Sequence, residues 1–338
     1  MNNSVLKNTV FGALRHLASS VFAGPRTLLS LTLALACVGC GPSTPDALKP
    51  GEVRTWPPFA GKQPIKAVCT TGMVADIVRH VAGPHAEVEQ IMGEGIDPHL
   101  FKATPDIISR LAQSDVIFYS GLHLEGRMAE VFERLAERKP TIAVTSSIPV
   151  DKLQNIGHDE HDPHVWFDVA LWSLTIDSVE KFLTTFDPAH AADYKTNATS
   201  YRAELQQLDQ ECREKLAVIP TDGRVLVTAH DAFHYFGRAY NVEVRAVQGV
   251  STETEAGVKE INGLVDFIVA RKIKAVFIET SVSDRNVQAL LEGCKHEGHA
   301  VGIGGELFSD SMGKAGTPEG TYVGMVRHNV DVIAKALR

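Results

Sequence analysis

The stretch "DPAHAADYKTNATSYRAELQQLDQECREKLAVIP" (187–220) decides the fold, because it separates two similar halves of the chain. Asp187 is typical of a helix N-cap, and Pro188 suits the first helical position. Apolar residues then recur every three or four positions: Tyr194, Tyr201, Leu205, Leu208, Cys212 and Leu216. This spacing predicts a helix with one apolar face, ended by Pro220 and Gly223. Roughly 30 residues would span about 45 Å, long enough to act as a stiff strut between two lobes.

Short β-type apolar runs alternate with helical patterns on both sides of this stretch. The candidate strands before it are 65–71, 86–92, 115–121 and 141–147, and those after it are 224–230, 242–248, 274–280 and 299–307. Alternation of this kind indicates parallel sheets covered by helices. The sequence therefore predicts an α/β fold of two (βα)-type lobes, each with a four-stranded, mainly parallel sheet, joined by one long rigid helix.

The first 39 residues are typical of an export signal. Three basic residues and no acidic residue precede the apolar run "LLSLTLALACVGC" (28–40), which is too short to span a bilayer permanently. Cys40 ends this run before "GPSTPD" and resembles the lipid-anchor cysteine of bacterial lipoproteins. Because Cys37 stands where a leucine is usual, lipidation of Cys37 and simple cleavage of the signal both stay open as alternatives.

Composition and periodicity divide the chain into five segments. We expect a signal peptide over 1–39, a tether rich in Pro and Gly over 40–63, an N-terminal lobe over 64–186, a connecting helix over 187–219 and a C-terminal lobe over 220–338. The net charge of −8 argues against nucleic acid as a partner. Cys69, Cys212 and Cys294 lie beyond the signal, and their odd number implies no disulfide framework. Buried free thiols are favoured over a single Cys212–Cys294 bridge.

Four residues of metal-ligand type follow the carboxyl ends of predicted strands. They are His99 in "DPHLFKATPD", His164 in "HDPHVWFD", His230 in "TAHDAFHYF" and Asp310 in "FSDSMG". Open α/β sheets bind ligands at this edge. Three neutral imidazoles and one carboxylate suit a borderline divalent transition metal, whereas calcium and magnesium prefer oxygen ligands. Four protein ligands with no open position favour holding a metal over catalysis with it.

Four separated motifs resemble the zinc/manganese-binding extracytoplasmic solute-binding proteins of metal-ion ABC transporters. They cover 97–128, 162–172, 228–240 and 304–313, and the resemblance extends over about residues 65–338, long helix included. It implies one manganese or zinc ion (iron as a further option) held between two lobes by His99, His164, His230 and Asp310. It also implies a monomer without cofactor or enzymatic activity, lipid-anchored outside the cytoplasmic membrane, that delivers its ion to an ABC permease.

The run "GHDEHDPHVWFDVALW" (157–172) concentrates histidine and acidic residues around His164. Zinc-specific members of the resembled family expand this loop into a long histidine-rich tract, and here it is a stub. The stub favours the branch that handles manganese, zinc or iron. For His158 and His161, a solvated polar loop is favoured over a metal-collecting one.

Residues beside these motifs receive more than one interpretation. Asp97 and Asp162 each precede a proposed ligand histidine by two positions, so they either orient an imidazole or form the turn before proline. The remaining expectations are a loop-shaping role for His123, a helix-surface position for His234, packing of Trp166 and Trp172 beside the His164 loop, an ion-pair network of Glu279, Asp284 and Arg285, and contact of Glu253 and Glu255 with the permease or with water.

Two other functional classes stay open. A secreted metal-dependent hydrolase would need an open metal position and a general base, such as the glutamate of H-E-x-x-H, and the chain contains no such motif. A surface adhesin would be compatible with a lipid anchor. Because histidine must be neutral to bind a metal, the capture hypothesis predicts an affinity that falls below about pH 6.5.

Overall fold

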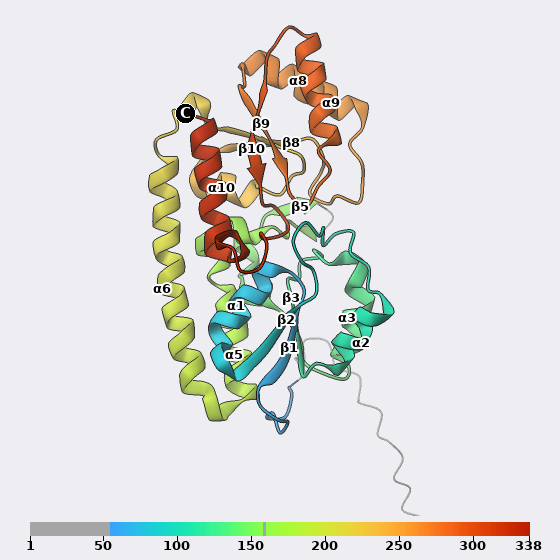
Figure 1. Cartoon of the computed structure of the whole chain (residues 1–338), viewed down its shortest axis with the longest axis vertical. Helices are drawn as coiled ribbons and strands as arrows, with labels where there is room; N and C mark the ends of the chain where they lie inside the picture. Colours follow the sequence, from blue (N-terminus) through green and yellow to red (C-terminus); the bar gives the residue numbers. More distant parts are fainter. Residues whose placement is uncertain (1–54, 158–159) are drawn as a thin grey trace, which may run out of the picture. The chain divides into compact units, whose positions relative to one another are not determined.

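The computed structural model describes residues 55–157 and 160–338 and shows the predicted α/β architecture (Figure 1). The N-terminal sheet is built from β1 (Ile65–Cys69), β2 (Ala86–Gln90), β3 (Val116–Tyr119) and β4 (Thr141–Ala143). Its order is β2-β1-β3-β4, and every pairing in it is parallel. The prediction of a four-stranded parallel sheet in this half is confirmed.

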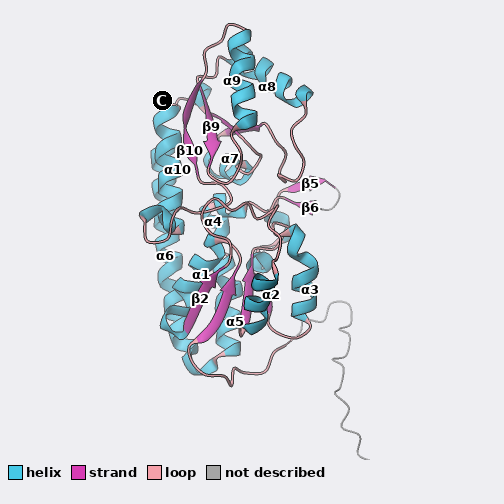
Figure 2. Ribbon diagram, turned by 45° about the vertical axis from the view of Figure 1, so that its right-hand side comes forward, coloured by secondary structure: helices cyan, strands magenta, loops and turns pink. Residues whose placement is uncertain are grey.

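Helices cover both faces of the N-terminal sheet, as Figures 1 and 2 show. They are α1 (Gly72–Ala82), α2 (Pro105–Gln113), α3 (Ala129–Ala136), α4 (Val169–Trp172) and α5 (Thr175–Phe186). Because successive strand residues point to opposite faces, Cys69 and Phe118 pack in the core that contains α1 and α5, whereas Val68 and Ile117 pack with α2 and α3. Thr104 caps α2 by accepting a hydrogen bond from the backbone of Ile107.

The C-terminal half contains four strands and four helices. The strands are β7 (Val225–Thr228), β8 (Glu243–Ala246), β9 (Ala275–Glu279) and β10 (Gly302–Leu307). The helices are α7 (His234–Tyr240), α8 (Val258–Arg271), α9 (Arg285–His296) and α10 (Tyr322–Ala336). The strands are parallel, but they hydrogen-bond as two pairs, β7 with β8 and β9 with β10, while β7 lies beside β9. The expected continuous four-stranded ladder is therefore divided in the middle.

The long helix α6 (Ala191–Leu216) packs against α1 and α5 of the first half and against α10 of the second (Figure 1). Its 26 residues span about 39 Å. Every apolar position predicted for its inner face is buried. The helix begins later than the sequence predicts, because residues 188–190 form a separate 3₁₀ turn. Asp187 does not cap α6 and instead accepts hydrogen bonds from the side chains of Gln63 and Tyr194.

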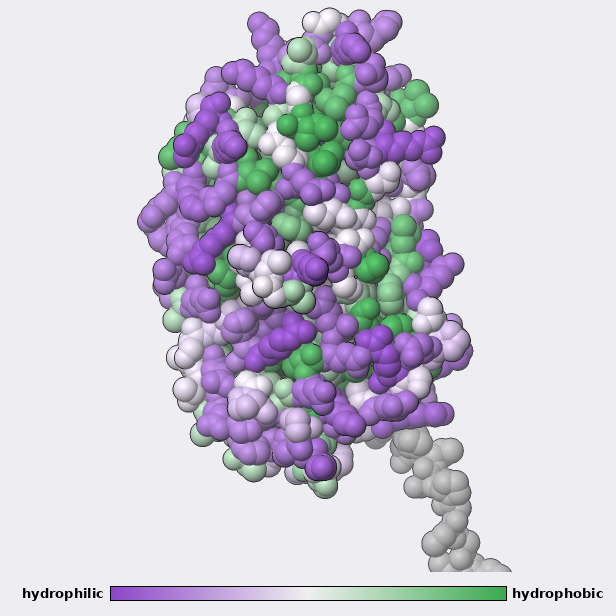
Figure 3. All heavy atoms as spheres, viewed as in Figure 1, coloured by the Kyte–Doolittle hydropathy of each residue, from purple (hydrophilic) through white to green (hydrophobic). Residues whose placement is uncertain are grey.

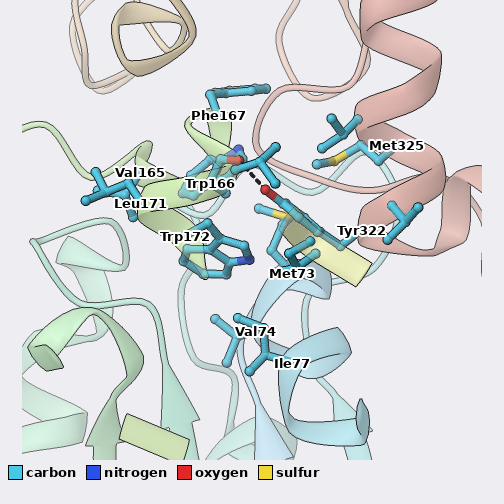
Figure 4. Packing of buried hydrophobic residues seen from close by; sticks show 14 of the residues in the cluster. Met73, Val74, Ile77, Val165, Trp166, Phe167, Leu171, Trp172, Tyr322 and Met325 are labelled. Atoms are coloured by element: carbon cyan, nitrogen blue, oxygen red, sulfur yellow. Dashed lines mark hydrogen bonds between the residues drawn. The ribbon is translucent and has the colours of Figure 1, made fainter. Parts of the chain in front are cut away.

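Aromatic packing joins the two halves beside α6 (Figure 4). Trp166 and Trp172 are fully buried, and the Tyr322 hydroxyl donates to the carbonyl oxygen of Trp166 at 2.7 Å. The carboxylate of Asp76 in α1 accepts from the Tyr201 hydroxyl of α6 at 2.5 Å and from the backbone N–H of Tyr322 at 3.2 Å. We call Asp76, Tyr201 and Tyr322 the Asp76 junction, because they tie α1, α6 and α10 together.

The described part of the predicted tether lies against the N-terminal lobe. The backbone N–H of Phe59 donates to the carbonyl oxygen of Phe186 in α5, and the two rings are 5.4 Å apart. The predicted signal peptide, Cys37 and Cys40 lie outside the described residues. None of the helices in 55–157 and 160–338 has the length and apolar character needed to cross a membrane.

The surface and the thiols complete the description of the fold. Figure 3 shows a face covered largely by hydrophilic residues, with hydrophobic residues in small groups between them. Cys69, Cys212 and Cys294 are buried free thiols, which agrees with the favoured alternative and not with a Cys212–Cys294 bridge. Burial raises the pKa of all three thiols, that of Cys212 to about 12.

Candidate metal centre

The side chains of His99, His164, His230 and Asp310 converge on one buried point. Each offers one ligand atom, and these atoms all lie within 4.8 Å of one another. The shortest separations are 3.2 Å between His230 Nε2 and Asp310 Oδ2, and 3.3 Å between the Nε2 atoms of His99 and His164. Metal–ligand bonds of about 2.0–2.2 Å place neighbouring ligand atoms roughly this far apart, so the spacing fits a single ion.

Each of the four residues lies in a segment that follows the carboxyl end of a parallel strand. His99 comes after β2, His164 after β4, His230 two residues after β7 and Asp310 three residues after β10. A hairpin of β5 (Asn155–Gly157) and β6 (Glu160–His161) precedes His164 and is visible at mid-height in Figure 2. The structure thus brings together all four residues that the sequence singled out, two from each side of α6.

Carboxylates fix the orientation of two of the imidazoles. Asp162 Oδ1 lies 2.7 Å from His164 Nδ1 and also accepts from the backbone N–H of His164. Glu279 at the end of β9 contacts His230 in the same way, with Oε2 2.5 Å from Nδ1 and Oε1 accepting from the backbone N–H. Both rings therefore present Nε2 to the common point. Asp162 thus fits both interpretations, because it orients the imidazole of His164 and also accepts the backbone hydrogen bond of the turn.

Sequence reasoning missed the specific role of Glu279. It placed this residue in an ion-pair network with Asp284 and Arg285, but its carboxylate is buried and engages His230. Strands β7 and β9 are neighbours, and both end at the edge of the C-terminal lobe where the four residues meet. Glu279, the last residue of β9, therefore lies beside His230, two residues after β7. The signal that was available is the position of Glu279 as the last residue of a buried strand.

His99 is held differently from the other two histidines. Its backbone N–H donates to Asp97 Oδ1 at 2.8 Å, and the other oxygen of Asp97 accepts from the Thr252 hydroxyl at 2.5 Å. In the described residues, Asp97 thus fixes the loop and not the ring, which is the turn-forming interpretation with an added contact to the other lobe. The His99 side chain is 4% exposed, whereas those of His164 and His230 are completely buried.

The electrostatics of the group favour a cation. Burial alone would lower the pKa of His164, but the charges of Asp162 and Asp310 outweigh it and raise this pKa to about 9. Burial would also lower the pKa of His230, but the charges of Glu279 and Asp310 outweigh it and hold this pKa well above its usual value. Burial raises the pKa of Asp310, yet the two imidazoles overcome this effect and hold it well below the usual range. His99 has its pKa lowered to about 4, chiefly by burial.

Unpartnered buried atoms give a further test of the fit. Among the described residues, both carboxylate oxygens of Asp310 and Nε2 of His230 are buried and form no well-aligned hydrogen bond. Their nearest polar neighbours are one another, at 3.2 Å, and His164 Nε2, 3.4 Å from Asp310 Oδ1. Buried polar atoms are nearly always partnered in folded proteins, because leaving them desolvated and unpaired costs about 1–3 kcal/mol each. These three atoms face the common point, so a divalent cation there would satisfy all of them.

The other histidines near the group occupy its surroundings. His234, in the first turn of α7, is 37% exposed and lies 3.1 Å from Asp231 and 3.7 Å from Asp162. His123 has a positive φ of 62°, and it lines a cavity of about 330 Å³ together with His99 and His161. His161 itself belongs to β6, and His158 lies outside the described residues. This cavity adjoins the candidate metal centre on the side of His99.

Two α/β halves joined by a long helix, each giving two side chains to one buried group, define a bilobed solute-binding protein that encloses a small cargo between its lobes. Comparison with known proteins specifies this class further. The chain belongs to the family described as zinc-uptake complex component A, periplasmic, whose profile matches residues 67–336.

Relatives agree with this assignment over most of the chain. "Manganese-binding lipoprotein MntA" of Bacillus subtilis is 43% identical over 309 residues, which cover 91% of this chain and 97% of the relative. "Zinc-binding protein TroA" of Treponema pallidum is 47% identical over 270 residues, 80% of this chain and 88% of the relative. The solved structure of the Treponema pallidum periplasmic zinc-binding protein TroA matches with a TM-score of 0.80 at 46% identity, covering 82% of this chain and 99% of that one.

Proposed function

We propose that this protein captures one divalent transition metal ion, manganese or zinc, outside the cytoplasmic membrane and delivers it to the permease of an ABC transporter for import. The observation that carries the proposal is the convergence of three imidazole nitrogens and one carboxylate on a buried point with unpartnered atoms. Family membership supports it, as do the names of the relatives, one described as manganese-binding and the other as zinc-binding.

The proposed ligands are His99, His164, His230 and Asp310. Three neutral imidazoles and one carboxylate leave a divalent ion with a net charge of about +1, which lowers the cost of burying it. Asp162 and Glu279 keep the rings of His164 and His230 in the ligating orientation. The ion would replace the protons that the metal-free site places on these two imidazoles, so capture releases protons.

The arrangement favours holding the ion over catalysis with it. A metal hydrolase keeps one coordination position open for water and supplies a general base beside it. Here four protein side chains surround the point, and the adjoining carboxylates of Asp162 and Glu279 are engaged by imidazole Nδ1 atoms. Capture and release therefore involve coordination bonds and proton exchange at the ligands, and no covalent bond of a substrate is changed.

The proposal includes a place of action. An export signal over 1–39 followed by lipidation of Cys40 would anchor the protein at the outer side of the membrane, and the relative MntA is itself named a lipoprotein. The protein would act there as a monomer. Divalent zinc binds most nitrogen and oxygen sites more tightly than manganese, so the biological cargo is defined by transport and not by affinity.

Metal analysis of the purified protein tests the capture step. We expect one tightly held ion per chain and no hydrolytic activity, with the ion lost in His230→Ala. His296→Ala is the matched control, because the His296 side chain is 88% exposed on α9, and it should keep the ion. A metal-free wild-type protein after equilibration with manganese and zinc would refute the proposal.

Transport is tested separately in cells. A strain lacking this protein should grow poorly when metals are depleted, and adding one of the two metals should restore growth. Restored growth with the wild-type chain but not with His230→Ala would link import to the metal centre. Equal growth of the deletion strain and its parent under depletion of either metal would contradict the import role.

A further inference from the structure

A segment of the C-terminal lobe reaches across to the N-terminal lobe beside the metal centre. It spans residues 247–257, between β8 and α8. The Thr252 hydroxyl donates to Asp97 Oδ2 at 2.5 Å, and Glu253 Oε1 lies 2.7 Å from Arg127 Nε. We call the two pairs, Asp97–Thr252 and Arg127–Glu253, the clasp. Each pair joins a residue of the N-terminal lobe, which precedes α6 in the sequence, to a residue of the C-terminal lobe, which follows it.

The clasp acts on the loop that carries His99. Asp97 accepts a hydrogen bond from the backbone N–H of His99 with one carboxylate oxygen and from the Thr252 hydroxyl with the other. Thr252 therefore acts on the His99 loop through a single intervening residue, Asp97. Thr252 is 8% exposed, which shields this hydrogen bond from water. A buried hydrogen bond to a charged acceptor is stronger than an exposed one.

The clasp also lies where an ion would leave the site. The cavity of about 330 Å³ beside His99 is lined by Arg127, Ser251 and Glu253. His99 is the ligand on this side, and it is the most exposed of the three histidines. On the opposite side, the buried Asp76 junction and α6 hold the lobes together. Separation of the lobes therefore begins most easily at the clasp.

We propose that Thr252 and Glu253 are positioning residues that hold the His99 loop against the C-terminal lobe and thereby set the rate of metal release. This inference rests on the proposed function, since it requires an ion at the centre. Thr252 is the larger contributor because its hydrogen bond is buried. Glu253 and Arg127 are 48% and 31% exposed, and such exposed ion pairs contribute little individually.

Release rates measured by stopped-flow with an excess of chromophoric chelator test the proposal on zinc-loaded protein. Thr252→Val should release zinc about tenfold faster than wild type, as expected for loss of a hydrogen bond to a carboxylate. Thr252→Ser keeps the hydroxyl and should release at nearly the wild-type rate. Glu253→Gln should accelerate release about twofold, and less at high salt.

Matched controls lie in the same segment. Thr254 and Glu255 are exposed neighbours, so Thr254→Val and Glu255→Gln should leave the release rate unchanged. Thermal unfolding of metal-free Thr252→Val should show a midpoint lowered by only a few degrees, as loss of one hydrogen bond implies, so that release is measured on folded protein and positioning is separated from general destabilisation. Equal release from Thr252→Val and wild type, or equal acceleration by Thr254→Val, would overturn the proposal.

Amide hydrogen exchange in the metal-free protein supplies a readout that needs no ion. In Thr252→Val, residues 93–100 and 247–257 should exchange faster together, while α6 stays unchanged. If Thr252→Val exchanges faster but the wild-type chain binds no zinc, the proposed function is refuted and the clasp remains a contact between the lobes. Unchanged exchange would refute the clasp, even if zinc is bound.

Discussion

In the C-terminal lobe, His230 is buried between two carboxylates, Glu279 behind it and Asp310 in front. In the N-terminal lobe, His99 has no carboxylate behind its ring among the described residues, and its loop is held through the backbone. The first imidazole has a raised pKa and the second a lowered one. The comparison teaches that the lobes give equal numbers of proposed ligands but hold them differently. Each lobe places one carboxylate behind an imidazole, Asp162 behind His164 and Glu279 behind His230, and the C-terminal lobe alone adds a proposed ligand carboxylate, Asp310.

Removal of a proposed ligand should produce the largest effect and should differ between the lobes. We expect Asp310→Asn to weaken zinc binding by more than about 100-fold, beyond the range known for residues that only orient ligands. His99→Gln should weaken it less, because the charge that neutralises the ion remains. Competition with a chelator of known affinity measures both losses. A greater loss for His99→Gln than for Asp310→Asn would reverse the comparison.

Neutralising the carboxylate behind His230 should have the next largest effect. The Glu279 carboxylate faces two donors of His230, its backbone N–H and its Nδ1–H. In Glu279→Gln the amide N–H₂ group would face one of these donors and could not accept from it, so zinc affinity should fall about 10- to 100-fold. Glu306→Gln is a matched control in the neighbouring strand β10, where the Glu306 side chain is exposed. Isothermal titration should detect the loss in the first variant alone. Wild-type affinity in Glu279→Gln would show that orientation of His230 does not depend on this charge.

Proton competition should separate the two imidazoles that have a carboxylate behind them, His164 and His230, from His99. Because the pKa of metal-free His164 is raised to about 9, the ion must displace a proton at every pH below this value. Zinc affinity should therefore fall about tenfold per pH unit and displaced proton, starting well above the pH 6.5 expected from an unperturbed histidine. The slope should persist in His99→Gln, since the pKa of His99 is lowered to about 4. Titrations between pH 6 and 8.5 measure it, and a flat profile would contradict the assignment.

The Asp76 junction should influence stability and leave binding almost unchanged. Tyr201→Phe removes the buried hydroxyl that donates to Asp76, which should lower the free energy of unfolding by about 1–3 kcal/mol. Zinc affinity should change less than twofold. Urea denaturation of metal-free protein measures the first quantity, with Thr199→Ala on the exposed face of α6 as a control. A large loss of affinity in Tyr201→Phe would mean that this region also shapes the metal centre.

Much of the fold can be predicted from the sequence, because the spacing of apolar residues indicates which positions are buried. The apolar spacing of α6 predicted its inner face, and the order of strands placed the four proposed ligands at strand ends. The start of α6 was missed, because Asp187 and Pro188 also suit a 3₁₀ turn. The sequence did not predict that the C-terminal strands hydrogen-bond as two separate pairs. The spacing of apolar residues identifies a single strand but does not indicate which strand pairs with it.

Contacts between the lobes were the least predictable part of the site. Thr252 and Asp97 are separated by 155 positions, and neither has a sequence pattern that points to the other. Glu279 was noticed but assigned to the wrong partners, because the neighbour of a strand end depends on how β7 and β9 pack. Sequence spacing thus identified the proposed ligands, whereas the residues that orient them required the three-dimensional arrangement.

The buried thiols make this protein well suited to optical measurement of its own motion. Cys69, Cys212 and Cys294 are protected from labelling reagents by burial and by raised pKa values, since only an accessible thiolate reacts rapidly. With Cys37 and Cys40 replaced, because they lie outside the described residues, a single new cysteine on an exposed helix of each lobe would therefore carry the fluorophores almost exclusively. Energy transfer between the two dyes could then follow the lobes in single molecules, with the three buried cysteines left in place.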